Sequence, residues 1–201
     1  HRSEQRQVAQ PLTGSPAPTG APKGTVVTVE DLFYNVPARL KFLKSDLAER
    51  RHSDALVTRY ALAYPAVRFR LTHDGRETFQ SSGSGDPREA LIGVFGLDVA
   101  RQLLPIEDQI PNLQSEIPNL QSEIAVSGFV SPPALTRSNR REITLFVNRR
   151  WVQDQRLTAA ILQAYHTLLM VNQYPLAVVM VDIPPEAVDV NVHPAKAEVR
   201  F

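Results

Sequence analysis

The run PLAVVMVDI, residues 175–183, is apolar at every position except Asp182. A strand with one face in water alternates apolar and polar residues, whereas a strand covered on both faces is apolar throughout. Residues 175–183 therefore predict a central strand of a sheet with both faces covered.

The segments before this run supply the neighbours of the strand. Residues 123–133 and 141–152 each predict one strand, because apolar residues alternate along them. Asp154 is a capping residue, and the apolar positions after it recur at helical spacing: Leu157, Ile161, Tyr165 and Leu168. The order of strands and helices indicates an α/β fold in which one sheet is backed by helices.

The first third of the chain begins with a segment rich in proline and glycine, from which we expect a mobile loop over residues 1–23. Residues 24–33 alternate valine with polar residues and predict a strand. Pro37 favours the first turn of a short helix. Ser45 is placed to cap a helix that ends near Tyr64, because Pro65 cannot continue it.

Residues 66–82 predict a β-hairpin, with Asp74–Gly75 as its two-residue turn. Residues 83–87, GSGDP, are typical of a linker, and a helix that Gly96 ends is expected after them. The heptapeptide IPNLQSE occurs twice in succession, at 110–116 and 117–123. Its repeated proline excludes a stable helix, so we interpret the duplication as an insertion in a surface loop.

Composition excludes several classes of protein. The chain has a net charge of +1, 43% hydrophobic residues and no cysteine, which excludes disulfides and zinc sites built on sulfur. No apolar run approaches the ~20 residues that a membrane span needs. The polar first ten residues do not resemble a signal peptide, so a cytoplasmic location is expected. The start at His1, without Met, suggests a piece of a longer chain.

Basic residues are concentrated in residues 136–156: Arg137, Arg140, Arg141, Arg149, Arg150 and Arg156. Only Glu142 and Asp154 oppose them. Arginine binds phosphate bidentately, so the segment is either a nucleic-acid contact or an ordinary solvated face. Trp151, in the same segment, either stacks on a base or packs in the core.

The C-terminal segment DVNVHPAKAEVRF, residues 189–201, predicts a strand that Pro194 ends. Lys196 beyond it either meets a phosphate or is a surface charge. His193 is expected to be hydrogen-bonded in a turn rather than a base or metal ligand, because no partner stands at a metal-ligand spacing. Gly24 and Thr25 either approach a nucleotide or merely begin a strand.

Three segments together closely resemble the MutL family of DNA mismatch repair proteins: residues 24–45, 145–154 and 189–201. The resemblance implies that residues 1–84 are the C-terminal part of an ATPase domain of the GHKL type. It also implies that residues 85–201 are a transducer domain with a fold like domain 2 of ribosomal protein S5. In such proteins ATP binding closes a homodimer, which signals from MutS to a downstream nuclease and helicase.

The resemblance also assigns roles to single residues. Lys196 matches the lysine that reaches the ATP γ-phosphate, and Gly24 and Thr25 match the last nucleotide-binding motif. Arg149, Arg150 and Arg156 lie in or beside the family's DNA-interacting strand–helix region, and Arg140 and Arg141 of the same basic segment are expected to bind DNA as well. The family has VNGR where this chain has VNRR, so Arg149 stands in place of a glycine. An arginine expected directly after the aspartate is displaced to Arg156.

No catalytic residue is expected in this chain, because the family's general-base glutamate and magnesium-binding asparagine are absent from it. ATP and Mg²⁺ are therefore expected as cofactors of the full-length protein only, and this chain alone should not hydrolyse ATP. DNA is the expected partner, and no membrane is. The alternatives are a free-standing S5-like nucleic-acid-binding module without nucleotide coupling, and a different enzyme that uses Lys196 as an acid or base.

Overall fold

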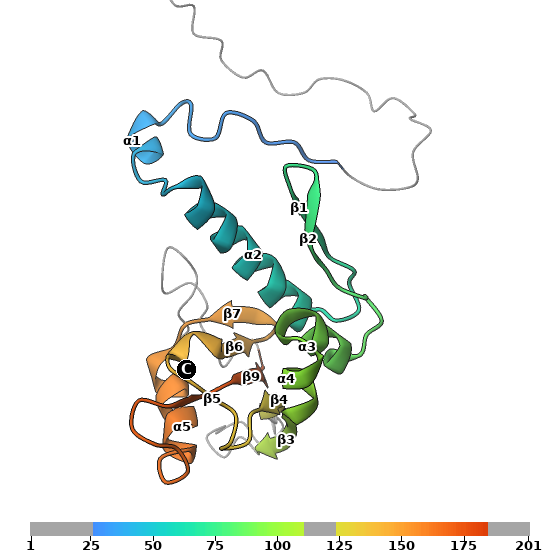
Figure 1. Cartoon of the computed structure of the whole chain (residues 1–201), viewed down its shortest axis with the longest axis vertical. Coiled ribbons are helices and arrows are strands. Elements are labelled where there is room, and N and C mark those ends of the chain that lie inside the picture. The colour runs from blue at the N-terminus through green and yellow to red at the C-terminus, as the bar shows by residue number, and fades with distance from the viewer. Residues whose placement is uncertain (1–25, 111–123, 185–201) are drawn as a thin grey trace, which may run out of the picture. The chain divides into compact units, whose positions relative to one another are not determined.

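The structure, a computed structural model, describes residues 26–110 and 124–184 (Figure 1). The chain divides into two compact units, residues 1–43 and 44–201. The domain boundary predicted between residues 84 and 85 falls inside the second unit, and it stays a prediction. Because the parts of the chain are not placed relative to one another, each unit is described by itself.

In the first unit the described residues contain one short helix, α1 (Pro37–Leu40), where Pro37 predicts it. Residues 26–30 form no strand, and Val26 and Val27 are 92% and 80% exposed. The strand predicted for residues 24–33 is therefore wrong over its described part. Alternation alone does not make a strand, because the backbone N–H and C=O groups of a strand also need a neighbouring strand to pair with.

The second unit is built around a five-stranded sheet in the order β3-β4-β9-β6-β7. The strands are β3 (Leu104–Ile110), β4 (Ile124–Val130), β6 (Ile143–Val147), β7 (Arg150–Val152) and β9 (Ala177–Asp182). Only the central pair, β6 and β9, is parallel. The single strand predicted over residues 141–152 is thus wrong: the segment forms two antiparallel strands joined by a tight turn.

Helices cover both faces of β9, as its apolar run predicts. Val178 belongs to a buried cluster that includes residues of α3 (Pro87–Phe95) and α4 (Leu97–Gln102). Val179 belongs to a second cluster, against which α5 (Gln155–Ala164) packs. Successive residues of a strand point to opposite faces, so neighbouring valines of β9 fill the two cores.

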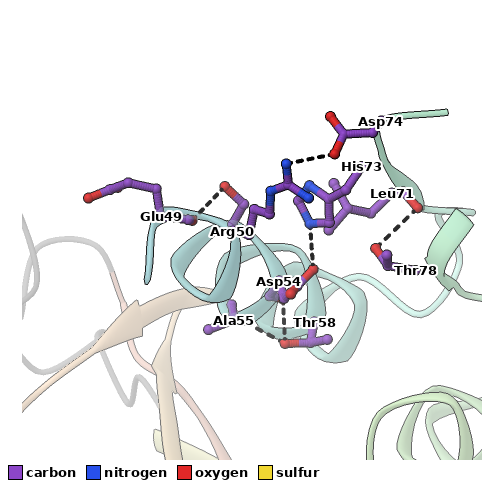
Figure 2. Close-up of polar contacts among 10 residues, drawn as sticks. Glu49, Arg50, Asp54, Ala55, Thr58, Leu71, His73, Asp74 and Thr78 are labelled. Carbon is purple, nitrogen blue, oxygen red and sulfur yellow. Dashed lines mark hydrogen bonds and ion pairs between the residues drawn. The ribbon is translucent and has the colours of Figure 1, made fainter. Parts of the chain in front are cut away.

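The helix predicted after Ser45 is α2 (Asp46–Ala63), and the predicted hairpin is β1 (Arg70–His73) and β2 (Arg76–Gln80). Figure 2 shows one hydrogen bond and one ion pair that hold the hairpin against α2. His73 Nε2 lies 2.9 Å from Asp54 Oδ1, and Arg50 Nη2 lies 2.6 Å from Asp74 Oδ2. Asp74 and Gly75 both have positive φ, as the predicted two-residue turn requires.

The remaining elements are short. β5 (Thr136–Arg137) pairs with β8 (Tyr174–Pro175), and a 3₁₀ turn, η1 (Arg140–Glu142), precedes β6. Helix α5 ends at Ala164, so Leu168, which the periodicity includes, lies beyond it and is exposed. No helix among the described residues is long and apolar enough to cross a membrane.

Candidate nucleic-acid interface

The turn that joins β6 to β7 consists of Asn148 and Arg149, with φ of 48° and 62°. Two consecutive positive φ values define the tight hairpin turn in which Asn-Gly is the preferred pair. Asn148 suits this conformation, but Arg149 occupies the position where a side chain is strained. The sequence analysis missed this turn, because Arg149 stands where a two-residue hairpin turn usually has glycine.

The guanidinium of Arg149 contacts helix α2. Its Nη1 donates a 2.9 Å hydrogen bond to the carbonyl oxygen of Ala63, the last residue of α2. The last four carbonyls of a helix lack partners within it, and their partial negative charge favours a cation. Arg149 is exposed as a residue, although this bond is partly buried. Its role as a DNA contact stays a prediction, and its side chain already has a protein partner.

Trp151, two residues further on, packs against the buried cluster that contains Phe146 and Leu62. The guanidinium carbon of Arg59, from α2, lies 3.8 Å from the centroid of the indole ring. Arg59 is itself partly buried, and the loss of solvent around its guanidinium lowers its pKa from the ordinary value. Of the two predictions for Trp151, the structure supports packing in the core, because Arg59 covers a face that a base would need.

The other predicted DNA contacts, Arg140, Arg141, Arg150 and Arg156, are exposed. Within residues 26–110 and 124–184, none of them forms an ion pair with an acidic side chain. Arg137 differs, because its Nε donates to Glu142 Oε2 at 2.5 Å. The four exposed arginines are therefore available to bind phosphate, whereas Glu142 neutralises the charge of Arg137.

The structure does not bring the arginines together at one point. Arg150 begins β7 just beyond the C-terminal end of β6, whereas Arg140 and Arg141 lie in η1 before its N-terminal end. Five residues at about 3.3 Å each separate these two groups by roughly 15 Å along the strand. A surface of that length suits a charged backbone better than a single phosphate group.

Local contacts position two of these side chains. Asp154 caps α5 and accepts hydrogen bonds from the backbone N–H groups of Arg156 and Leu157, at 2.8 and 2.9 Å, which places Arg156 in the first turn. The guanidinium of Arg140 lies 5.2 Å from the centroid of the Tyr174 ring in β8. An aromatic ring restricts an exposed arginine without neutralising its charge.

A cavity of about 540 Å³ lies beside the end of α2. Ala63 and Arg149 contribute to its wall, together with Leu91 and Phe129. Glu107 and Asp182 stand at the same cavity, so it carries acidic as well as basic groups. That mixture gives no preference for an anionic ligand.

The predicted nucleotide contacts Gly24, Thr25 and Lys196 lie outside the described residues, as does His193. Their roles therefore stay predictions. Within the two described ranges, no group of three or more His, Asp and Glu side chains is placed to hold a metal ion.

Comparison with known proteins identifies the family. Residues 91–201 match the family described as "DNA mismatch repair protein, C-terminal domain". The chain is 45% identical over 184 residues to the DNA mismatch repair protein MutL of Limosilactobacillus reuteri, covering 92% of this chain and 26% of the relative. With MutL of Geobacillus kaustophilus it shares 44% identity over 179 residues, covering 89% of this chain and 27% of the relative. The chain belongs to the MutL family of DNA mismatch repair proteins.

Solved structures agree with the fold expected of MutL. The ATPase domain of Aquifex aeolicus MutL, complexed with ADP, superposes with a TM-score of 0.52 at 30% identity over 78% of this chain and 52% of that chain. The N-terminal domain of a DNA repair protein gives a TM-score of 0.67 at 23% identity, which shows the fold alone, over 84% of this chain and 53% of that one. The fold class predicted from the sequence, the end of a GHKL ATPase domain followed by an S5-like transducer, is therefore confirmed.

The chain spans only about a quarter of the length of the MutL relatives that it matches.

Proposed function

We propose that this chain is the part of a MutL protein that couples ATP binding to DNA binding and dimer closure, and so signals from MutS to downstream repair enzymes. The observation that carries the DNA-binding part is a set of four exposed arginines that precede and follow β6 in the chain: Arg140, Arg141, Arg150 and Arg156. Their partners would be successive phosphates of a nucleic-acid backbone, which needs clustered positive charge rather than base recognition.

DNA binding by the purified chain, measured as a function of salt, tests this role. Each phosphate contact contributes about 0.9 to the slope of log affinity against log salt concentration for duplex DNA. Arg150→Ala and Arg156→Ala should each lower the slope by about that amount. Arg76→Ala is the matched control, because this arginine is exposed on the β1–β2 hairpin rather than beside β6. No DNA binding at low salt would refute the DNA-binding part.

The nucleotide part of the proposal concerns the whole MutL protein. The related Aquifex aeolicus domain is an ATPase domain with ADP bound, which supports a nucleotide site in the same family. We expect Lys196 to contact the γ-phosphate, with Gly24 and Thr25 near the same nucleotide and Mg²⁺ as cofactor. A contact that forms only with ATP bound is what allows a nucleotide to change a conformational population.

The test is Lys196→Ala in a full-length protein that contains this chain. ATP hydrolysis should fall while circular dichroism stays unchanged. Normal turnover in this variant would refute the assignment of Lys196. The chain by itself should show no ATP hydrolysis, since the base that activates water is expected elsewhere in the protein.

A further inference from the structure

The Asn148–Arg149 turn contacts two elements that come from distant parts of the sequence. Arg149 donates to the carbonyl of Ala63 at the end of α2. Asn148 holds the end of β9: its N–H donates to Val181 O at 2.9 Å, and its Oδ1 accepts from Ile183 N at 2.8 Å. The turn therefore fastens the end of a helix and the end of a strand to each other.

A second contact reinforces the link to α2. Arg59 covers the ring of Trp151, so the residues on both sides of Arg150 are held by the same helix. Arg150 itself is exposed and lies between these two fixed neighbours. Its position and direction are thus set by α2 as well as by the strands.

The backbone conformation of Arg149 indicates that its contact with α2 compensates for backbone strain. A residue other than glycine is strained in the left-handed region, and glycine would avoid that strain. In exchange, Arg149 supplies a charged donor to a helix carbonyl that has no partner within α2. A DNA contact at this position would not require the guanidinium to turn toward Ala63.

We propose that the Asn148–Arg149 turn is a junction that transmits the positions of α2 and β9 to Arg150, and that Arg149 is a positioning residue rather than a phosphate contact. The proposal rests on the proposed function for the role of Arg150. It gives Arg149 a definite effect, which is to attach the turn to the C-terminal end of α2.

The first test measures the junction without DNA, by amide hydrogen exchange at Leu62, Ala63 and Tyr64. Arg149→Gly should accelerate exchange there by a factor of about 3 to 10, the effect of one lost hydrogen bond. Arg149→Lys, which keeps a donor, should restore part of the protection. Trp151 is the only tryptophan, so its fluorescence should also change in Arg149→Gly.

The matched control for this substitution is Asn172→Gly. Asn172 also has a positive φ, of 65°, but it lies in the loop after α5. This variant relieves a strained residue without removing a contact to α2, and should leave both readouts unchanged. Unchanged exchange at the end of α2 in Arg149→Gly would overturn the junction.

The second test is a double-mutant cycle on DNA affinity with Arg149→Gly and Arg150→Ala. If Arg149 acts through Arg150, its substitution has no further effect once Arg150 is removed. Additive losses would show two independent phosphate contacts and overturn the proposal. If the unmodified chain binds no DNA, the DNA-binding function fails, and the exchange measurement alone decides whether the junction exists.

Discussion

The guanidinium carbon of Arg59 in α2 lies 3.8 Å from the centroid of the Trp151 ring in β7. A partly buried cation–π contact contributes about 1–2 kcal/mol, and the stem of the arginine adds packing. Arg59→Ala should therefore lower the free energy of unfolding by about 1–2 kcal/mol. Urea denaturation followed by Trp151 fluorescence measures this free energy. Loss of the covering guanidinium also exposes the indole in the folded variant.

Arg88→Ala is the control for this prediction. Its guanidinium lies 5.2 Å from the Phe129 centroid and the residue is exposed, so the substitution should cost less than about 1 kcal/mol. An equal loss in both variants would mean that the close contact between Arg59 and Trp151 adds nothing to stability.

Gly128 in β4 is the glycine for which the sheet leaves least room. A Cβ there would lie 2.0 Å from the carbonyl oxygen of Val178 in β9, and its φ is 141°. Gly128→Ala should destabilise the domain by more than about 4 kcal/mol, because the added Cβ can avoid the clash only if a central strand moves. Thermal unfolding followed by circular dichroism, or loss of soluble protein, is the measurement.

The control is Gly75→Ala in the β1–β2 turn, where φ is 76° and a Cβ would meet no atom within 4 Å. This variant should cost only about 1–2 kcal/mol, from backbone strain alone. Similar stability of the two variants would contradict the close approach of β4 to β9.

Sequence patterns correctly predicted those helices and strands that residues close together in the chain determine. The apolar run of β9 requires two covered faces, and Pro65 after Tyr64 fixes the end of α2. The predictions failed where a partner decides the outcome. Residues 26–30 alternate but form no strand, and residues 141–152 form a hairpin whose turn has Arg149 where glycine is usual.

The candidate site shows the same limit. Exposed arginines around β6 follow from sequence position, since charged residues that flank a buried strand remain in water. The contacts of Arg149 with Ala63 and of Arg59 with Trp151 join residues far apart in the chain. No spacing rule specifies such contacts, because they depend on how α2 packs against the sheet.

Tyr165, at the end of α5, donates its hydroxyl hydrogen to the carbonyl oxygen of Ser131. Tyr165→Phe should cost about 1–3 kcal/mol at neutral pH, because it leaves a buried acceptor without a partner. Burial raises the pKa of Tyr165, while the side-chain hydroxyl of Ser131, as a donor to the phenolate, acts in the opposite direction.

The raised pKa predicts a pH dependence. Above about pH 10 the unfolded chain loses the tyrosine proton while the folded chain keeps it, so stability falls as pH rises toward the folded-state pKa. Tyr165→Phe lacks this loss, and the stability difference between the two proteins should shrink between about pH 9 and 11. Urea denaturation across this range tests it, with Tyr60→Phe as a control at a half-exposed ring. A constant difference would refute the coupling.

Glu142 limits the positive charge beside β6, because it pairs with Arg137 next to Arg140 and Arg141. Glu142→Gln removes the negative charge and releases Arg137, whose side chain is 26% exposed. DNA affinity at low salt should rise, and the salt slope should steepen by up to about 0.9, the value for one added phosphate contact. Fluorescence anisotropy with a labelled duplex measures both quantities.

Glu77→Gln is the matched control for the release of Arg137, because Glu77 pairs with Arg70 at 2.7 Å on the β1–β2 hairpin. Both variants change the net charge equally, so a general electrostatic effect would raise affinity in both. A gain in Glu142→Gln alone would locate the DNA at the N-terminal end of β6. Equal gains, or none, would exclude that end of the strand and leave Arg150 as the contact to be tested.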